Sequence, residues 1–98
     1  MKIRVLSVDL EKKVTKNNPI DVARGKSCYT LFVFKSSGLI KTSIGLSDFN
    51  PGDCILIDPT FPQYIKCKHH DIVYDSISFK GSDATRLVQQ VGLDLNTL

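Results

Sequence analysis

Short apolar runs alternate with polar turns along most of the chain. The densest run of aromatic and β-branched residues lies at 29–35, and shorter runs lie at 3–10, 39–43, 46–49, 54–57, 63–67 and 72–79. Turn-forming residues separate these runs, most clearly Asn50-Pro51-Gly52-Asp53. Strands of similar length divided by turns at near-regular spacing are typical of a small antiparallel sandwich or barrel. The pattern therefore predicts a mainly β domain.

Three segments depart from simple alternation. The apolar positions of 3–10 change phase after Val5, which predicts a strand with a bulge or bend. Residues 11–26 are polar and contain Asn17-Asn18-Pro19, so they form a loop or an edge, with 20–22 as a short strand at most. Residues 68–71 are predicted to form the tip of a hairpin between the last two strands.

Helical spacing occurs only near the C-terminal end. Apolar residues recur at Ala84, Leu87, Val88 and Val91, which predicts a helix over about 83–91. Ser82 is the predicted N-cap, and Gly92 lies just past the last turn. The single apolar stripe of this helix must pack on other residues, most simply on an outer face or an end of the barrel.

Length and composition limit the function classes. Ninety-eight residues suffice for one core, so 1–98 is predicted to be a single domain with its strands within 3–79. The net charge of +3 is spread along the chain, which argues against nucleic acid as its own partner. No apolar run resembles a signal peptide or a membrane span, so we expect a cytoplasmic protein that does not bind membranes.

The sequence carries no pattern typical of catalysis. Its three cysteines, Cys28, Cys54 and Cys67, lack the paired spacing of zinc ligands and are interpreted as reduced core or edge thiols. His69 and His70 lie on the predicted hairpin tip, where a solvated turn is the simplest interpretation. No GxSxG or GxxxxGK[ST] motif is present. We therefore expect a binding protein with no catalytic residue, metal site or cofactor.

One constellation resembles a known family. A Pro51-Gly52-Asp53 turn precedes an apolar strand and a loop containing Pro59 and Pro62, and a later strand ends in Phe79-Lys80-Gly81 before the helix. Over about 29–93 this order resembles the cupin-type, sugar-sensor domain at the N-terminus of AraC-family transcriptional regulators. The resemblance implies a small antiparallel cupin-like (jelly-roll) barrel with one C-terminal α-helix. The chain departs from the family pattern at Ser36-Ser37-Gly38, where G-x-G is usual, and at Gln63, where histidine is common.

The resemblance also implies which side chains point into the barrel. The position of Gln63 points inward in the family, and Ile65 and Cys67 should share its face. Two other strands are expected to contribute inward side chains, from Tyr29, Leu31, Val33 and Lys35 and from Tyr74, Ser76 and Ser78. The predicted ligand-binding residues are Tyr29, Lys35, Gln63, Ile65, Tyr74 and Ser76.

Two alternatives remain for these residues. The same side chains could fill a small core, with the serines bonded to neighbouring backbone, and Lys35 could face solvent. On the opposite face of the 29–35 strand, Thr30, Phe32 and Phe34 are expected to point outward. That stripe needs cover from the C-terminal helix or a partner subunit.

The resemblance implies the effector-binding and dimerisation domain of an AraC-type regulator. Such a domain binds a small polar molecule such as a sugar, forms a homodimer, and contacts DNA only through a C-terminal helix-turn-helix domain that this chain lacks. The apolar tail at Leu93, Leu95 and Leu98 suggests a piece of a longer regulator rather than a free-standing sensor. Alternatives are a stand-alone metal-dependent cupin enzyme and a structural dimerisation module with a filled core.

Overall fold

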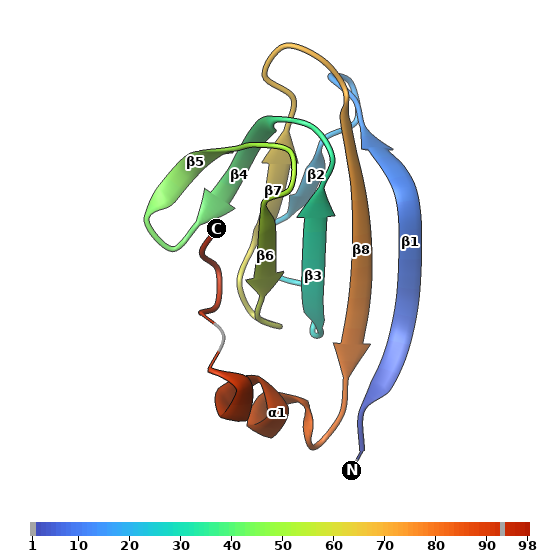
Figure 1. The fold of residues 1–98 in the computed structure, drawn as a ribbon, viewed down its shortest axis with the longest axis vertical. Coiled ribbons are helices and arrows are strands. Elements are labelled where there is room, and N and C mark those ends of the chain that lie inside the picture. The colour runs from blue at the N-terminus through green and yellow to red at the C-terminus, as the bar shows by residue number, and fades with distance from the viewer. Residues whose placement is uncertain (1, 93) are drawn as a thin grey trace.

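A computed structural model describes residues 2–92 and 94–98 as two antiparallel sheets and one helix (Figure 1). The first sheet has the order β1 (Arg4–Val14), β8 (Ile72–Lys80), β3 (Tyr29–Phe34) and β6 (Cys54–Ile57). The second has the order β2 (Ile20–Val22), β7 (Gln63–Lys66), β4 (Gly38–Thr42) and β5 (Gly45–Phe49). Helix α1 (Ala84–Val91) follows β8. The prediction of a mainly β chain with one C-terminal helix is confirmed.

The strand pairs follow a simple rule. β1 pairs with β8, β2 with β7, β3 with β6 and β4 with β5. The first strand in the chain thus pairs with the last, the second with the second-to-last, and so on toward the middle. Consequently β7 and β8 lie in different sheets, and residues 68–71 cross from one sheet to the other. The predicted hairpin tip at 68–71 is therefore wrong. Turn residues indicate where a chain reverses, but not to which sheet the next strand belongs.

The bulge predicted in the first strand is confirmed. The register of β1 against β8 shifts between Val5 and Ser7 and again between Asp9 and Lys12. Glu11 has a φ of 54°, a left-handed conformation that accommodates the second irregularity. The strand also runs farther than predicted, to Val14, because its last residue is fully buried in the core.

Aromatic side chains fill the space between the sheets. Phe34 of β3 stacks on Phe49 of β5 with ring centroids 3.7 Å apart, and Phe32 lies beside Phe34. The interior cluster consists of Val14, Phe32, Phe34, Ile40, Phe49, Ile55, Ile57, Ile65 and Ile72. Thr30 is also buried. The expectation that Thr30, Phe32 and Phe34 point outward is therefore wrong.

The other face of β3 lies outside the sandwich. Tyr29 stacks on Phe79 at 5.4 Å and belongs to a second cluster with Leu56, Ala84 and Val88. Because side chains alternate along a strand, Leu31 and Val33 share this outer face, and their predicted inward direction is also wrong. β3 is apolar on both faces because α1 covers one end of the outer face, so alternation could not indicate the inner one.

Helix α1 packs on the outer face of the first sheet, as predicted. Its apolar positions Ala84 and Val88 are buried against that sheet, and Gly92 ends it in the left-handed conformation. The N-cap is Asp83 and not the predicted Ser82. The carboxylate of Asp83 accepts a hydrogen bond from the backbone amide of Lys2 instead of capping the helix.

The C-terminal residues are tied to the proline-containing loop. The side-chain oxygen of Asn96 accepts a hydrogen bond from the Asp58 amide, and its backbone amide donates to the carbonyl of Leu56. The carboxylate of Asp58 also accepts bonds from Thr60 and from the amide of Phe61. Burial opposes ionisation of Asp58, but the hydrogen bonds from Thr60, Asn96 and Phe61 outweigh it and lower the pKa of this carboxyl group.

The predicted apolar tail is described only in part. Leu95 packs against the outer cluster, whereas Leu98 is exposed and Leu93 lies outside the described residues. Across 2–92 and 94–98, no helix is long and apolar enough to cross a membrane.

The orientation of β3 can be tested by truncating neighbouring side chains. Phe32→Ala empties space in the interior and should lower the free energy of unfolding by about 3–5 kcal/mol. Val33→Ala, on the outer face, should change it by less than about 1 kcal/mol. Urea unfolding of both variants measures the difference. Equal losses, or a larger loss for Val33→Ala, would contradict the orientation described here.

The network around Asp58 should make stability depend on pH. Because the folded-state pKa lies below the ordinary value of 3.8, the ionised carboxylate stabilises the fold above that pH and ceases to do so as the pH falls through the folded-state pKa. Asp58→Asn should therefore cost about 1–2 kcal/mol at pH 7. The cost should shrink in the acid range. Asp94→Asn, at an exposed position of the tail, is the control, and thermal unfolding at several pH values is the measurement. A cost that does not change with pH would contradict this role.

Candidate functional site

A row of polar side chains crosses the apolar interior and joins the two sheets. Gln63, the first residue of β7, is fully buried, and its side-chain nitrogen donates to the Thr30 hydroxyl of β3 at 3.1 Å. The Thr30 hydroxyl lies 3.2 Å from the hydroxyl of Ser78 on β8. All three side chains are at least nine-tenths buried. A connected polar row in such surroundings is costly to bury unless its groups are bonded.

One side-chain atom of this row lacks a hydrogen-bond partner within the described part of the chain. Among the described residues, the Oε1 atom of Gln63 is a buried side-chain atom without a hydrogen-bond partner. Rotating the amide by half a turn would leave its nitrogen unpartnered instead, so one end of the group lacks a partner in either orientation. Buried polar groups in folded proteins almost always have partners, so an exception requires an explanation. A bound molecule that donates a hydrogen bond is one such explanation.

The structure brings four other predicted inward residues to the same interior. Ile65 is fully buried in the core, two residues after Gln63. Ser76 and Tyr74 pair with Phe32 and Phe34, so they share the inner face of the first sheet. Cys67, expected on the face of Gln63, packs against the same core and donates to the carbonyl of Val14.

Tyr74 lies at the border of this interior. Its ring packs edge-on against Phe32, with centroids 5.4 Å apart. Burial, and secondly the charge of Asp9, raises the pKa of the Tyr74 hydroxyl, which therefore remains protonated at neutral pH. The group can thus donate a hydrogen bond.

Tyr29 does not belong to this interior. Its hydroxyl lies 2.9 Å from that of Thr85 on α1, on the outer face of the first sheet. The expectation that Tyr29 points inward with Gln63 is wrong, because the inner face of β3 is formed by Thr30, Phe32 and Phe34.

Lys35 also lies outside the interior. Its ammonium group contacts Glu11 at 2.8 Å and Asp75 at 3.4 Å, and its side chain is 42% exposed. Hydrogen bonding to Glu11 raises the pKa of Lys35 most, burial opposes the rise, and Asp75 adds to it. Bonding to the Glu11 backbone amide lowers the pKa of Asp75. Lys35 therefore contacts β1 at its second irregularity, around Glu11, and the alternative in which Lys35 faces solvent is the correct one.

Sequence reasoning missed Thr30. A threonine within an aromatic strand carries no signal of its own, because threonine is common in strands whether or not it binds a ligand. Only the pairing of β3 with β8 places it between Gln63 and Ser78. The alternation of side chains along the strand could have found it, because Thr30 lies on the same face as Phe32 and Phe34.

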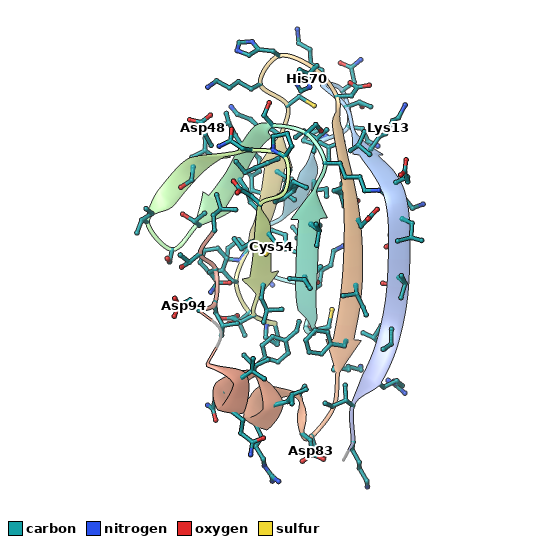
Figure 2. The ribbon with its side chains drawn as sticks, in the orientation of Figure 1. Lys13, Asp48, Cys54, His70, Asp83 and Asp94 are labelled. Carbon is teal, nitrogen blue, oxygen red and sulfur yellow. The ribbon has the colours of Figure 1, made fainter. Side chains whose placement is uncertain are left out.

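The two histidines line a hollow that includes none of the residues of the polar row. His70 lies at the end of the molecule where the chain crosses between the sheets (Figure 2). A hollow of about 310 Å³ there is lined by Lys16, Cys67, Lys68, His69, His70 and Asp71. Within the part of the chain that the structure describes, no three histidine, cysteine or acidic side chains are grouped so that they could hold a metal ion.

Comparison of the chain with protein-family models, with curated proteins and with solved structures gave no match.

The unpartnered amide predicts an unusual effect on stability. Gln63→Leu keeps a side chain of similar size, removes the unsatisfied group and leaves the Thr30 and Ser78 hydroxyls bonded to each other. Because an unsatisfied buried polar group costs about 1–3 kcal/mol, this variant should be as stable as the wild type or up to about 2 kcal/mol more stable. Urea unfolding measures the change. A loss of several kcal/mol would mean that the amide is fully satisfied in the folded protein.

Proposed function

We propose that this chain is the effector-sensing domain of an AraC-type transcriptional regulator acting in the cytoplasm. It binds a small polar molecule between its two sheets and self-associates. The observation that carries the proposal is the buried amide of Gln63, one end of which has no partner among the described residues in a mostly apolar interior. Such an arrangement is typical of ligand sites, where an apolar lining surrounds a few placed hydrogen-bonding groups.

The strand order supports a jelly-roll fold of the cupin type. Pairing of β1 with β8, β2 with β7, β3 with β6 and β4 with β5 is the pattern obtained when one long antiparallel ribbon is wrapped into two facing sheets. Jelly rolls are built from eight strands in this manner. The proposal therefore combines this order with the resemblance carried by the Pro51-Gly52-Asp53 turn and the proline loop.

The polar row favours a ligand rich in hydroxyl groups. Gln63 of the row offers an acceptor, while Ser78 of the row and Ser76 and Tyr74 on the same face of β8 offer hydroxyls that can both donate and accept. No cationic or acidic side chain belongs to the row or to the interior cluster, among the described residues. A neutral polyol or sugar therefore suits the site better than a charged acid.

Access to Gln63 requires movement of side chains at the border of the core. Phe61 is only partly buried and lies two residues before Gln63. A ligand would displace this ring or that of Tyr74, because the remaining interior is closely packed. We therefore expect binding to be accompanied by rearrangement of the 58–62 loop.

A structural module with a filled core is the second candidate. The nine buried apolar side chains between the sheets favour it, because they occupy the space where a ligand would lie. In that case the amide of Gln63 binds a water molecule, and the domain responds to no small molecule.

A ligand screen separates the two candidates. Thermal unfolding of the wild type is measured with a panel of pentoses, hexoses, inositol and hydroxy acids, and we expect a neutral sugar or polyol to raise the melting temperature. Gln63→Leu and Tyr74→Phe should each weaken binding by about three- to tenfold, since each removes one hydrogen bond. Tyr64→Phe, which makes the same chemical change on the neighbouring position of β7, is the matched control and should bind as the wild type does.

Two outcomes would count against the proposal. If no compound of the panel shifts the melting temperature, the filled-core module is favoured. If a compound binds equally well to the wild type and to Gln63→Leu, the ligand occupies another site.

A further inference from the structure

We propose that the edge of β1 is the surface through which two copies of this chain associate. The paired strands would run antiparallel about a two-fold axis, with Arg4 of each copy opposite Asp9 of the other. This inference names the surface for the self-association in the proposed function and rests on that part of it. It does not depend on the ligand.

β1 is a long strand with an open edge. It lies at the end of the first sheet and pairs with β8 on one side, while none of the described strands pairs with its other side. Val5, Val8 and Leu10 of this strand are 53%, 58% and 68% exposed. A long edge that presents unpaired backbone groups and apolar side chains is a template for another strand.

The bulge at Leu6 gives this edge a self-complementary pattern. In a regular strand Val5 and Val8 would point to opposite faces, because they are three residues apart. The register shift between Val5 and Ser7 places both on the outer face, opposite Phe79 and Ile77 of β8. By the same shift, Arg4 and Asp9 both point to the inner side. Bulges often turn an edge strand away from partners. This bulge instead places the two valines together on one face of the strand and the two charged residues together on the other.

Antiparallel pairing then matches each residue with a suitable one. With the two-fold axis between Leu6 and Ser7, Val5 lies opposite Val8 of the second copy, and both are on the outer face. On the inner side, Arg4 lies opposite Asp9 of the second copy. Each match occurs twice because of the symmetry. Apolar and oppositely charged cross-strand pairs are the ones that stabilise sheets.

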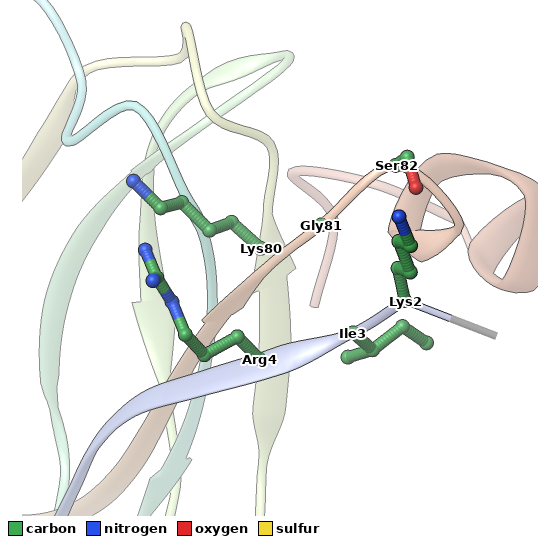
Figure 3. A pocket seen from close by; sticks show the side chains of 6 residues that line it. All are labelled: Lys2, Ile3, Arg4, Lys80, Gly81 and Ser82. Carbon is green, nitrogen blue, oxygen red and sulfur yellow. The ribbon is translucent and has the colours of Figure 1, made fainter.

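Arg4 and Asp9 of this strand form no ion pair with the other described residues. Figure 3 shows the side chains of Arg4 and Lys80 extending together from the start of β1 and the end of β8. They border a hollow of about 340 Å³ whose lining also includes Lys2 and Ser82. Among the described residues, none of the ion pairs includes Arg4, Lys80 or Asp9. A cationic group at one end and a carboxylate farther along the strand are thus available to a second copy.

A charge-swap experiment tests both the surface and the register. Sedimentation equilibrium of the wild-type chain should show a dimer. Arg4→Asp and Asp9→Arg each replace two attractive pairs with two repulsive ones, and each should raise the dimer dissociation constant at least about tenfold. An equimolar mixture of the two variants should recover wild-type affinity, because the mixed dimer again opposes unlike charges.

Apolar substitutions supply a matched control. Val8→Glu should weaken the dimer in the same manner. Leu46→Glu alters a comparably exposed residue, 52% against 58%, on β5 of the other sheet and should leave it unchanged. Circular dichroism of each variant verifies that the fold is retained.

The outcomes distinguish the two levels of the proposal. If the wild-type chain is monomeric at millimolar concentration, self-association itself is refuted and the β1 surface with it. If the wild type is a dimer that neither charge variant weakens, self-association stands and the β1 surface is wrong. If each charge variant is weakened but their mixture does not recover, the register with Arg4 opposite Asp9 is wrong.

Discussion

The contact between Phe34 and Phe49 determines the arrangement of the molecule. The two rings belong to different sheets and stack with centroids 3.7 Å apart, so they join the two sheets where β3 and β5 end. Once Phe34 faces inward, alternation requires that Phe32 and Thr30 do so too. Thr30 thereby meets Gln63, and Tyr29 is left on the outer face beneath α1. Both the polar row and the surface on which α1 packs therefore depend on this one stacking contact.

The strand positions could be predicted because local residues determine them. The Asn50–Asp53 turn and the proline loop mark where β5, β6 and β7 end or begin, and the phase change after Val5 marks the bulge. Which sheet a strand joins depends on contacts distant in the sequence. That is why residues 68–71 could not be recognised as a crossing between sheets. The face that each strand buries was equally hidden in β3, which is covered on both sides.

The resemblance predicted the correct inner face for β7 and β8 but not for β3. Gln63 and Ile65 point inward as expected, and so do Tyr74 and Ser76 on β8. The same resemblance placed Tyr29 and Lys35 on the wrong face, and the alternation of β3 could not correct it because both faces of that strand are apolar. Whether the inward residues bind a ligand stays a prediction. The missing partner of Gln63 is a property of three-dimensional packing and has no counterpart in the sequence.

The bonds between Asp58 and Asn96 have a consequence for how the molecule opens. The 58–62 loop and the tail are joined by hydrogen bonds of side-chain and backbone groups, and the carbonyl of Asn96 also accepts a bond from the amide of Ser43 in the turn between β4 and β5. Segments joined in this way open together in one local unfolding event rather than separately. A change that stabilises or destabilises the loop should therefore stabilise or destabilise the last residues as well, even though the loop and the tail are nearly forty positions apart along the chain.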